Sequence, residues 1–161
     1  MSMARILFLC LILTTVQAAA EEGKRYVCTD KKGDRRFTEQ YAGGCQEIPL
    51  EPGWKNFGVT PSVIVDIKPG DVISERDGIT VWMRFFLAED ADDVKGKWVY
   101  DYVESLNKFY CGKRETTLIE GTYKFQGETV YVRSPKESIT ETVDPGTVND
   151  SIYRALCEDD Q

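Results

Sequence analysis

The chain of 161 residues contains no histidine. This absence removes Ser-His-Asp and Cys-His catalytic arrangements, because both depend on an imidazole as the general base. It also removes the common zinc sites, and no Cys-x-x-Cys spacing is present to replace them. Of the common catalytic arrangements for hydrolysis, only a pair of carboxylates remains possible. We expect neither a metal nor another cofactor.

Long apolar runs are scarce, and the one at residues 6–13 is too short for a bilayer, which takes roughly 20 residues. This run follows Arg5 and precedes three alanines that end at Ala20, an order typical of a secretory signal peptide. We therefore expect residues 1–20 to be removed and the mature chain to contain no membrane segment. Lipidation at Cys10 is the alternative, but the residue before it is bulky where such signals need a small one.

Positive charge is also in short supply, with 20 basic residues against 27 acidic ones and a net charge of -7. Loss of Arg5 with the signal peptide leaves 19 basic residues and a net charge of -8. A field of that sign opposes binding to nucleic acids and to anionic membranes. We therefore expect no nucleic-acid partner, and only a local basic patch to attract a polyanion.

Cysteines are few, and the mature chain has an even set of four: Cys28, Cys45, Cys111 and Cys157. In an exported chain this favours two disulfides, for which three pairings are possible. We favour Cys28 with Cys45, because a hairpin at residues 24–38 is too small to be stable alone and a staple would contribute roughly 3 kcal/mol. We favour Cys111 with Cys157, which would tie a C-terminal helix to a sheet.

The first part of the mature chain has the pattern of a β-hairpin. Within residues 24–38, two short β-branched and aromatic runs flank a glycine-containing turn at 30–34. Residues 47–61 carry three prolines and two glycines without periodicity, which is typical of a linker. We expect a disulfide-stapled hairpin module at 21–52, followed by one larger domain at 53–161.

The larger segment contains several strand patterns. Alternation predicts strands at residues 63–67 and 79–88, and the second has apolar side chains on both faces, as a covered central strand does. A further hairpin is expected at 117–133. Four of its side chains are expected to share one face: Thr117, Ile119, Tyr123 and Phe125.

One helix is expected at the C-terminal end. Thr147 and Asp150 resemble a capping box, with Asp in place of Glu, and an apolar stripe follows them. Residues 98–110 fit both helical spacing and strand composition, and the pattern does not decide between them. The fold class is therefore expected to be α+β.

Basic residues concentrate in the hairpin, in an otherwise acidic protein: Lys24, Arg25, Lys31, Lys32, Arg35 and Arg36. Four of them, Lys31, Lys32, Arg35 and Arg36, are candidate binding residues for a polyanionic glycan or an acidic protein face. The alternative is a solvated hairpin tip that offsets the acidic remainder through an intramolecular contact.

Four acidic residues cluster between two apolar runs: Glu89, Asp90, Asp92 and Asp93. They suggest a glycosidase-like pair or a calcium site, but their spacing matches no calcium loop, and we expect a solvated turn.

Asp66 is expected on the outward face of a half-exposed strand, with a buried acid as the alternative. Four aromatic residues are candidates for a carbohydrate site, with core packing as the default: Trp82, Trp98, Tyr100 and Tyr102.

Two sets of residues resemble known families. The first is Tyr26, Cys28, Asp30, Gly33, Phe37, Thr38 and Glu39. It resembles a small domain of unknown function that follows the signal peptide in many proteobacterial envelope proteins. The second is Val81-Trp82, residues 100–106, Tyr110-Cys111, Tyr123, Pro145-Gly-Thr147 and Cys157. It looks like the surface-adhesin protein E family of Gram-negative bacteria, over residues 62–157.

The second resemblance implies that residues 98–110 form a strand, that the fold is an antiparallel β-sheet carrying a C-terminal helix, and that Cys111 pairs with Cys157. It also implies adhesion to host extracellular components, although it rests on core and disulfide positions, so no contact residues carry over. Residues 136–141 depart from the family, whose members often have an aromatic residue there. We expect an exported, non-enzymatic binding or structural module of the bacterial envelope. A secreted inhibitor and a carboxylate-dependent hydrolase of the periplasm are the alternatives.

Overall fold

A computed structural model describes residues 23–92 and 96–158, so the expected signal peptide lies outside the described residues. Within these ranges the chain forms eleven strands, two 3-10 helices and one α-helix. No helix in the described part is long and apolar enough to cross a membrane. The expected α+β class is confirmed.

The N-terminal module is a three-stranded antiparallel sheet in the order β2-β1-β3. Its strands are β1 (Tyr26–Thr29), β2 (Arg35–Thr38) and β3 (Cys45–Glu47). The predicted hairpin is β1 and β2, and the Asp30 carboxylate closes its turn by accepting the N–H groups of Lys32 and Asp34 at 2.7 and 3.0 Å. The third strand was not predicted. Because β3 places Cys45 opposite Cys28 on β1, the expected disulfide between them forms.

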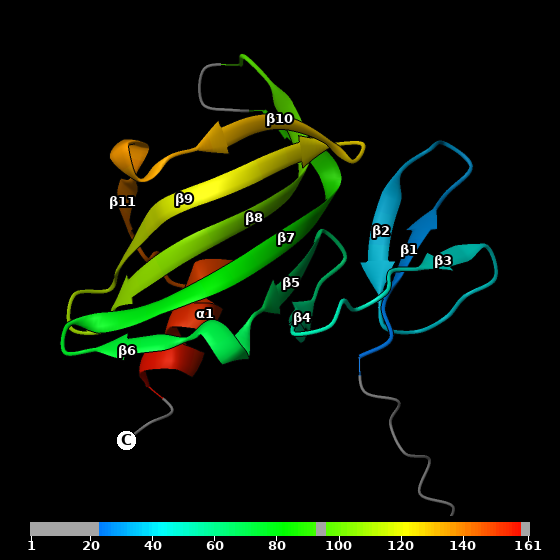
Figure 1. The fold of residues 1–161 in the computed structure, drawn as a ribbon. Coiled ribbons are helices and arrows are strands. Elements are labelled where there is room, and N and C mark those ends of the chain that lie inside the picture. The colour runs from blue at the N-terminus through cyan, green and yellow to red at the C-terminus, as the bar shows by residue number, and fades with distance from the viewer. Residues whose placement is uncertain (1–22, 93–95, 159–161) are drawn as a thin grey trace, which may run out of the picture.

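The larger sheet has eight antiparallel strands (Figure 1). They are β4 (Lys55–Val59), β5 (Val63–Ile67), β6 (Ile73–Glu75), β7 (Gly78–Asp92), β8 (Val99–Tyr110), β9 (Glu115–Phe125), β10 (Glu128–Arg133) and β11 (Ile139–Thr142). The main order is β10-β9-β8-β7-β5-β4, while β11 pairs with β9 and β6 with β7. The short 3-10 helices η1 (Pro69–Asp71) and η2 (Pro135–Glu137) lie in the connections.

Two sequence assignments are settled by this sheet. Residues 98–110, which the pattern left open, contain β8, a long strand between β7 and β9. The linker assigned to residues 47–61 is wrong in its second half, because β4 lies there. β4 is an edge strand with a register shift between Asn56 and Gly58, so prolines, a glycine and the irregular pairing hid its strand pattern.

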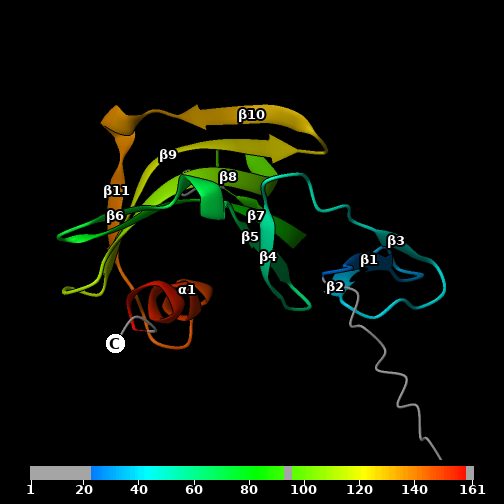
Figure 2. The same cartoon turned by 60° about the horizontal axis from the view of Figure 1, so that its bottom comes forward.

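The helix α1 (Val148–Cys157) covers one face of the sheet, which we call the helix face (Figure 2). Its predicted start is confirmed, since the Thr147 hydroxyl accepts the N–H of Asp150 at 3.2 Å. The buried residues Ile152 and Tyr153 pack there on a cluster that also contains Val65, Val81, Met83, Phe109 and Val143. The expected disulfide between Cys111 and Cys157 joins the helix end to the sheet.

The N-terminal module covers part of the opposite face, which we call the module face. Phe37 of β2 is buried against Ile64 and Ala88 of the larger sheet. Four half-buried side chains extend this contact: Val27, Ile48, Val59 and Phe86. In addition, the Phe37 N–H donates to the Pro61 carbonyl at 3.0 Å. The module is thus packed on the sheet through a small hydrophobic core of its own.

Candidate functional site

Asp66 is fully buried, so its expected place on an exposed strand face is wrong. The alternation correctly puts it opposite the helix face, but the N-terminal module covers that side. The carboxylate pairs with Arg25 of the module and with Arg84 of β7, whose Nε lies 2.6 Å from Oδ2. Asn56 Nδ2 also donates to Asp66 Oδ1 at 3.2 Å. Asp66 therefore belongs to a buried ionic cluster between module and sheet.

The two arginines of this cluster are also held by other groups. Arg25 donates to the carbonyls of Ile48 and Pro49, at 3.2 and 3.1 Å. Arg84 lies over the Trp54 ring at 4.6 Å, and Glu51 Oε2 is 2.9 Å from its Nη1. Two cations thus face two carboxylates. Because each charge has an opposite partner, the cluster ties the module to the sheet, although Arg84 Nη2 is buried there without a hydrogen-bond partner in the described structure.

The four candidate binding residues of the hairpin differ in their surroundings. Lys31, Lys32 and Arg36 are exposed. Arg35 turns towards the larger sheet, where its Nε donates to the Ala88 carbonyl at 3.0 Å and its Nη2 to Asp90 at 2.9 Å. An intramolecular contact of this kind was the alternative interpretation. The binding role of Lys31, Lys32, Arg35 and Arg36 stays a prediction.

The acidic cluster lies on a strand rather than in a turn. β7 continues through Glu89, Asp90 and Asp92, all exposed, with a register shift between Phe86 and Ala91. Asp93 lies outside the described residues. No group of three or more His, Cys, Asp or Glu side chains in the described part of the chain is arranged to hold a metal ion.

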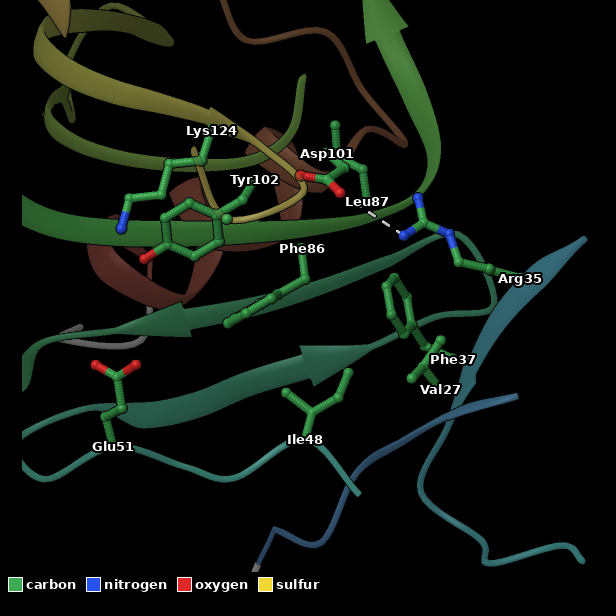
Figure 3. A pocket seen from close by; sticks show the side chains of 11 residues that line it. Val27, Arg35, Phe37, Ile48, Glu51, Phe86, Leu87, Asp101, Tyr102 and Lys124 are labelled. Atoms are coloured by element: carbon green, nitrogen blue, oxygen red, sulfur yellow. Dashed lines mark ion pairs between the residues drawn. The ribbon is translucent and has the colours of Figure 1, made fainter. Parts of the chain in front are cut away.

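One pocket of about 330 Å³, the interface pocket, lies where the module meets the sheet (Figure 3). Its apolar lining comes from both parts: Val27, Phe37, Ile48, Phe86 and Leu87. At its rim, Arg35 lies 3.7 Å from Asp101 and the Lys124 ammonium sits 5.3 Å from the Tyr102 ring centroid. Burial, followed by the hydrogen bond to Glu104, raises the pKa of Tyr102, which therefore stays neutral.

A larger hollow of about 650 Å³, the aromatic recess, opens on the helix face beside the start of α1. Four rings gather at one end of it: Trp98, Tyr100, Tyr123 and Tyr131. Trp98 stacks on Tyr131 with centroids 4.7 Å apart, and Tyr123 meets Trp98 edge-on at 4.9 Å. Polar side chains from β8, β9 and α1 line it as well: Asn107, Thr116 and Asn149.

The polar groups of the recess include two without partners. Arg133 Nη1 donates to the Glu137 carbonyl at 2.8 Å, but its buried Nε has no hydrogen-bond partner in the described structure. The same holds for the hydroxyl of Thr116, a residue that is 6% exposed. Hydrogen bonds lower the pKa of Glu137. The largest effect comes from the Ser134 backbone N–H, and the next from the Tyr131 hydroxyl at 2.9 Å. Glu137 is thus held as a carboxylate.

Two of the four aromatic candidates, Trp98 and Tyr100, line this recess. Trp82 and Tyr102 do not, because the pairing of β7 with β8 puts them on the module face. Tyr123 and Tyr131 were missed as site residues. Their meeting depends on the pairing of β9 with β10, which alternation along either strand does not reveal.

By its fold, the molecule is an antiparallel β-sheet protein with a C-terminal helix and a disulfide-stapled N-terminal module. Comparisons of the chain with models of known families, with curated proteins and with solved structures give no match. The resemblance to the surface-adhesin protein E family therefore stays a prediction that rests on the residues given above.

Proposed function

We propose that this chain is an exported binding module of the bacterial envelope that recognises its ligand without turnover. The aromatic recess carries this proposal. It combines stacked rings with polar side chains in one concave surface, the composition by which ligand sites usually differ from plain core packing. Most of its walls come from β8, β9, β10, β11 and α1, and Trp98 lies directly before β8.

The construction of the scaffold supports export. Disulfides Cys28–Cys45 and Cys111–Cys157 are of the kind that persists in oxidising compartments. The first joins β1 to β3 within the small module, and the second joins the end of α1 to the sheet. The leader-like residues 1–20 point the same way. Adhesion, which the family resemblance implies, is one form that such binding takes.

The carboxylate-dependent hydrolase is the weaker alternative. A glycosidase pair needs one carboxyl group whose pKa is raised enough for it to donate a proton. In the recess, hydrogen bonds from Ser134 and Tyr131 shift the pKa of Glu137 in the opposite direction. Glu137 suits a role in holding Tyr131 and Arg133 in position.

The proposal is tested with the oxidised chain of residues 21–161. Biolayer interferometry against immobilised envelope glycans and host-matrix proteins should give saturable binding, and the same preparations should release no product from glycan or ester substrates. Turnover would contradict the proposal in favour of the hydrolase. Export is tested separately, by expressing the full chain and sequencing the N-terminus of the mature protein, which should begin at Glu21.

A further inference from the structure

We infer that the aromatic recess binds an uncharged oligosaccharide. This inference rests on the proposed function and names the ligand class of the same surface. A sugar ring has an apolar face of C–H groups and a polar edge of hydroxyls, so it needs flat rings and hydrogen-bonding groups side by side. The recess offers both, with half-buried Trp98 and Tyr131 at one end and Asn149 beyond them. Asn107 also lines it, but its Nδ2 already donates to the Ser105 hydroxyl at 2.8 Å.

The size of the recess suits a chain of sugars better than one small ion. About 650 Å³ lies within the usual range for ligand sites of roughly 300–1,000 Å³. Three of the rings belong to β8, β9 and β10, and Trp98 directly precedes β8, while Asn149 belongs to the first turn of α1. A ligand that touches both must extend along the concave face of the sheet.

Two buried polar atoms beside the recess agree with a ligand there. The Thr116 hydroxyl and Arg133 Nε have no partner in the described structure, and both residues line the recess. Buried groups of this kind are rare in native proteins, because leaving one unpaired is unfavourable. Neither atom is exposed, so a bound sugar would satisfy the Arg133 Nε donor and the Thr116 hydroxyl through waters that it positions.

The charges around the recess favour an uncharged ligand. Asp92, Glu137 and Glu141 line it together with Lys97 and Arg133, a small acidic excess in a protein that is acidic overall. The Arg133 guanidinium lies 5.7 Å from the Tyr131 ring centroid, and its Nη1 donates to the backbone carbonyl of Glu137. A polyanionic glycan would therefore be repelled here. Such a ligand suits the hairpin residues instead.

The test is isothermal titration calorimetry with cello-oligosaccharides and fully N-acetylated chito-oligosaccharides, both uncharged, on the oxidised chain of residues 21–161. At least one series should bind saturably, with an affinity that added sodium chloride leaves unchanged. Trp98→Ala should weaken binding by about tenfold or more, since it removes a central aromatic anchor. The matched control is Tyr41→Ala, an aromatic residue that is 67% exposed in the N-terminal module, and it should bind normally.

A second variant keeps the test decisive if Trp98→Ala is unstable. Thr116→Val removes a hydroxyl without a partner, so it should raise the melting temperature and weaken oligosaccharide binding several-fold. A purely structural role would raise the melting temperature and leave the affinity unchanged.

The inference is overturned if both variants bind oligosaccharide as the wild type does. It is also overturned if the protein binds a matrix protein or a polyanion but neither the cello- nor the chito-oligosaccharides. That result would leave the proposed binding function standing. Absence of any ligand, by contrast, would remove the proposed function as well.

Discussion

At the scale of single residues, the most consequential side chain outside the recess is Asp66. Removing its charge would leave Arg25 and Arg84 buried side by side without their shared counter-ion. We expect Asp66→Asn to lower the free energy of unfolding by about 3–5 kcal/mol, as breaking a buried ion pair does. Urea denaturation monitored by circular dichroism measures this change.

The matched control for this variant is Asp71→Asn. Asp71 forms an exposed ion pair with Lys68 at 2.6 Å, and its loss should change stability by less than about 1 kcal/mol. Equal effects of the two substitutions would mean that the buried cluster adds nothing beyond a surface pair, and the tie between module and sheet would have to come from Phe37 and its neighbours.

For Asp66, the sequence predicts the face of the strand but not the burial of the side chain. Alternation put Val63 and Val65 on one face and Asp66 on the other, and the structure agrees. Whether that other face is exposed depends on a module some forty residues earlier in the chain, which alternation within one strand does not report. Arg25 was likewise assigned to a surface patch, because nothing local showed that it has a buried partner.

At the scale of elements, the start of α1 should make stability depend on acid pH. The Gly146 N–H, and then Arg114 and Arg154, lower the pKa of Asp150 to about 2. In the unfolded chain the pKa of an Asp side chain is about 3.9. The stabilisation from the Asp150 carboxylate is therefore complete above that pH and is lost as the pH falls towards about 2. We expect the melting-temperature difference between wild type and Asp150→Asn to be largest near neutral pH and to shrink across this window.

The control for the acid effect is Ser151→Ala in the same turn. It changes no titratable group, so its melting-temperature difference from wild type should stay constant over the same pH range. A difference for Asp150→Asn that also stays constant would show that this carboxylate does not account for the acid dependence.

The disulfide at the other end of α1 has a separate effect. It closes a loop with a sequence separation of 46, for which the chain-entropy model gives roughly 4 kcal/mol. Replacing Cys111 and Cys157 together by Ser should lower the free energy of unfolding by about 2–5 kcal/mol, typical for loss of a native bridge. Unchanged denaturation midpoints would mean that the contacts of Ile152 and Tyr153 hold the helix unaided.

The elements of the sheet were predictable where their pairing is regular. β1, β2, β5 and most of β7 follow simple alternation, and α1 begins at its predicted cap. In β9 the expected shared face of Thr117 and Tyr123 is wrong. A register shift leaves Ile119 without a partner on β8 and turns the residues before it to the other face. Such a bulge is set by the neighbouring strand, so the sequence of β9 alone does not show it.

At the scale of the whole molecule, two surfaces of opposite character are separated by the sheet. The recess lies on the helix face, while the hairpin belongs to the module on the other side. Replacing Lys31, Lys32 and Arg36 together by Gln should leave stability within about 0.5 kcal/mol, because all three are exposed. If the hairpin binds polyanions, this variant should lose salt-sensitive binding to heparin, measured by surface plasmon resonance.

Two further variants separate the surfaces. Trp98→Ala should leave any heparin binding unchanged, because the recess is not involved. Arg35→Gln should lower stability, because Arg35 joins the module to Ala88 and Asp90. Heparin binding that survives in the triple Gln variant with the same salt dependence would place the polyanion site away from the hairpin.

The central claim is that recognition takes place in the aromatic recess, and the three tryptophans of the chain allow a direct test. Trp54 lies over Arg84 and Trp82 is on the module face, whereas Trp98 lines the recess. In a nitrogen-15 NMR titration with cello- or chito-oligosaccharide, the indole signal of Trp98 should shift and saturate while those of Trp54 and Trp82 stay in place. An unchanged Trp98 signal under saturating ligand, or shifts confined to residues 31–36, would contradict it.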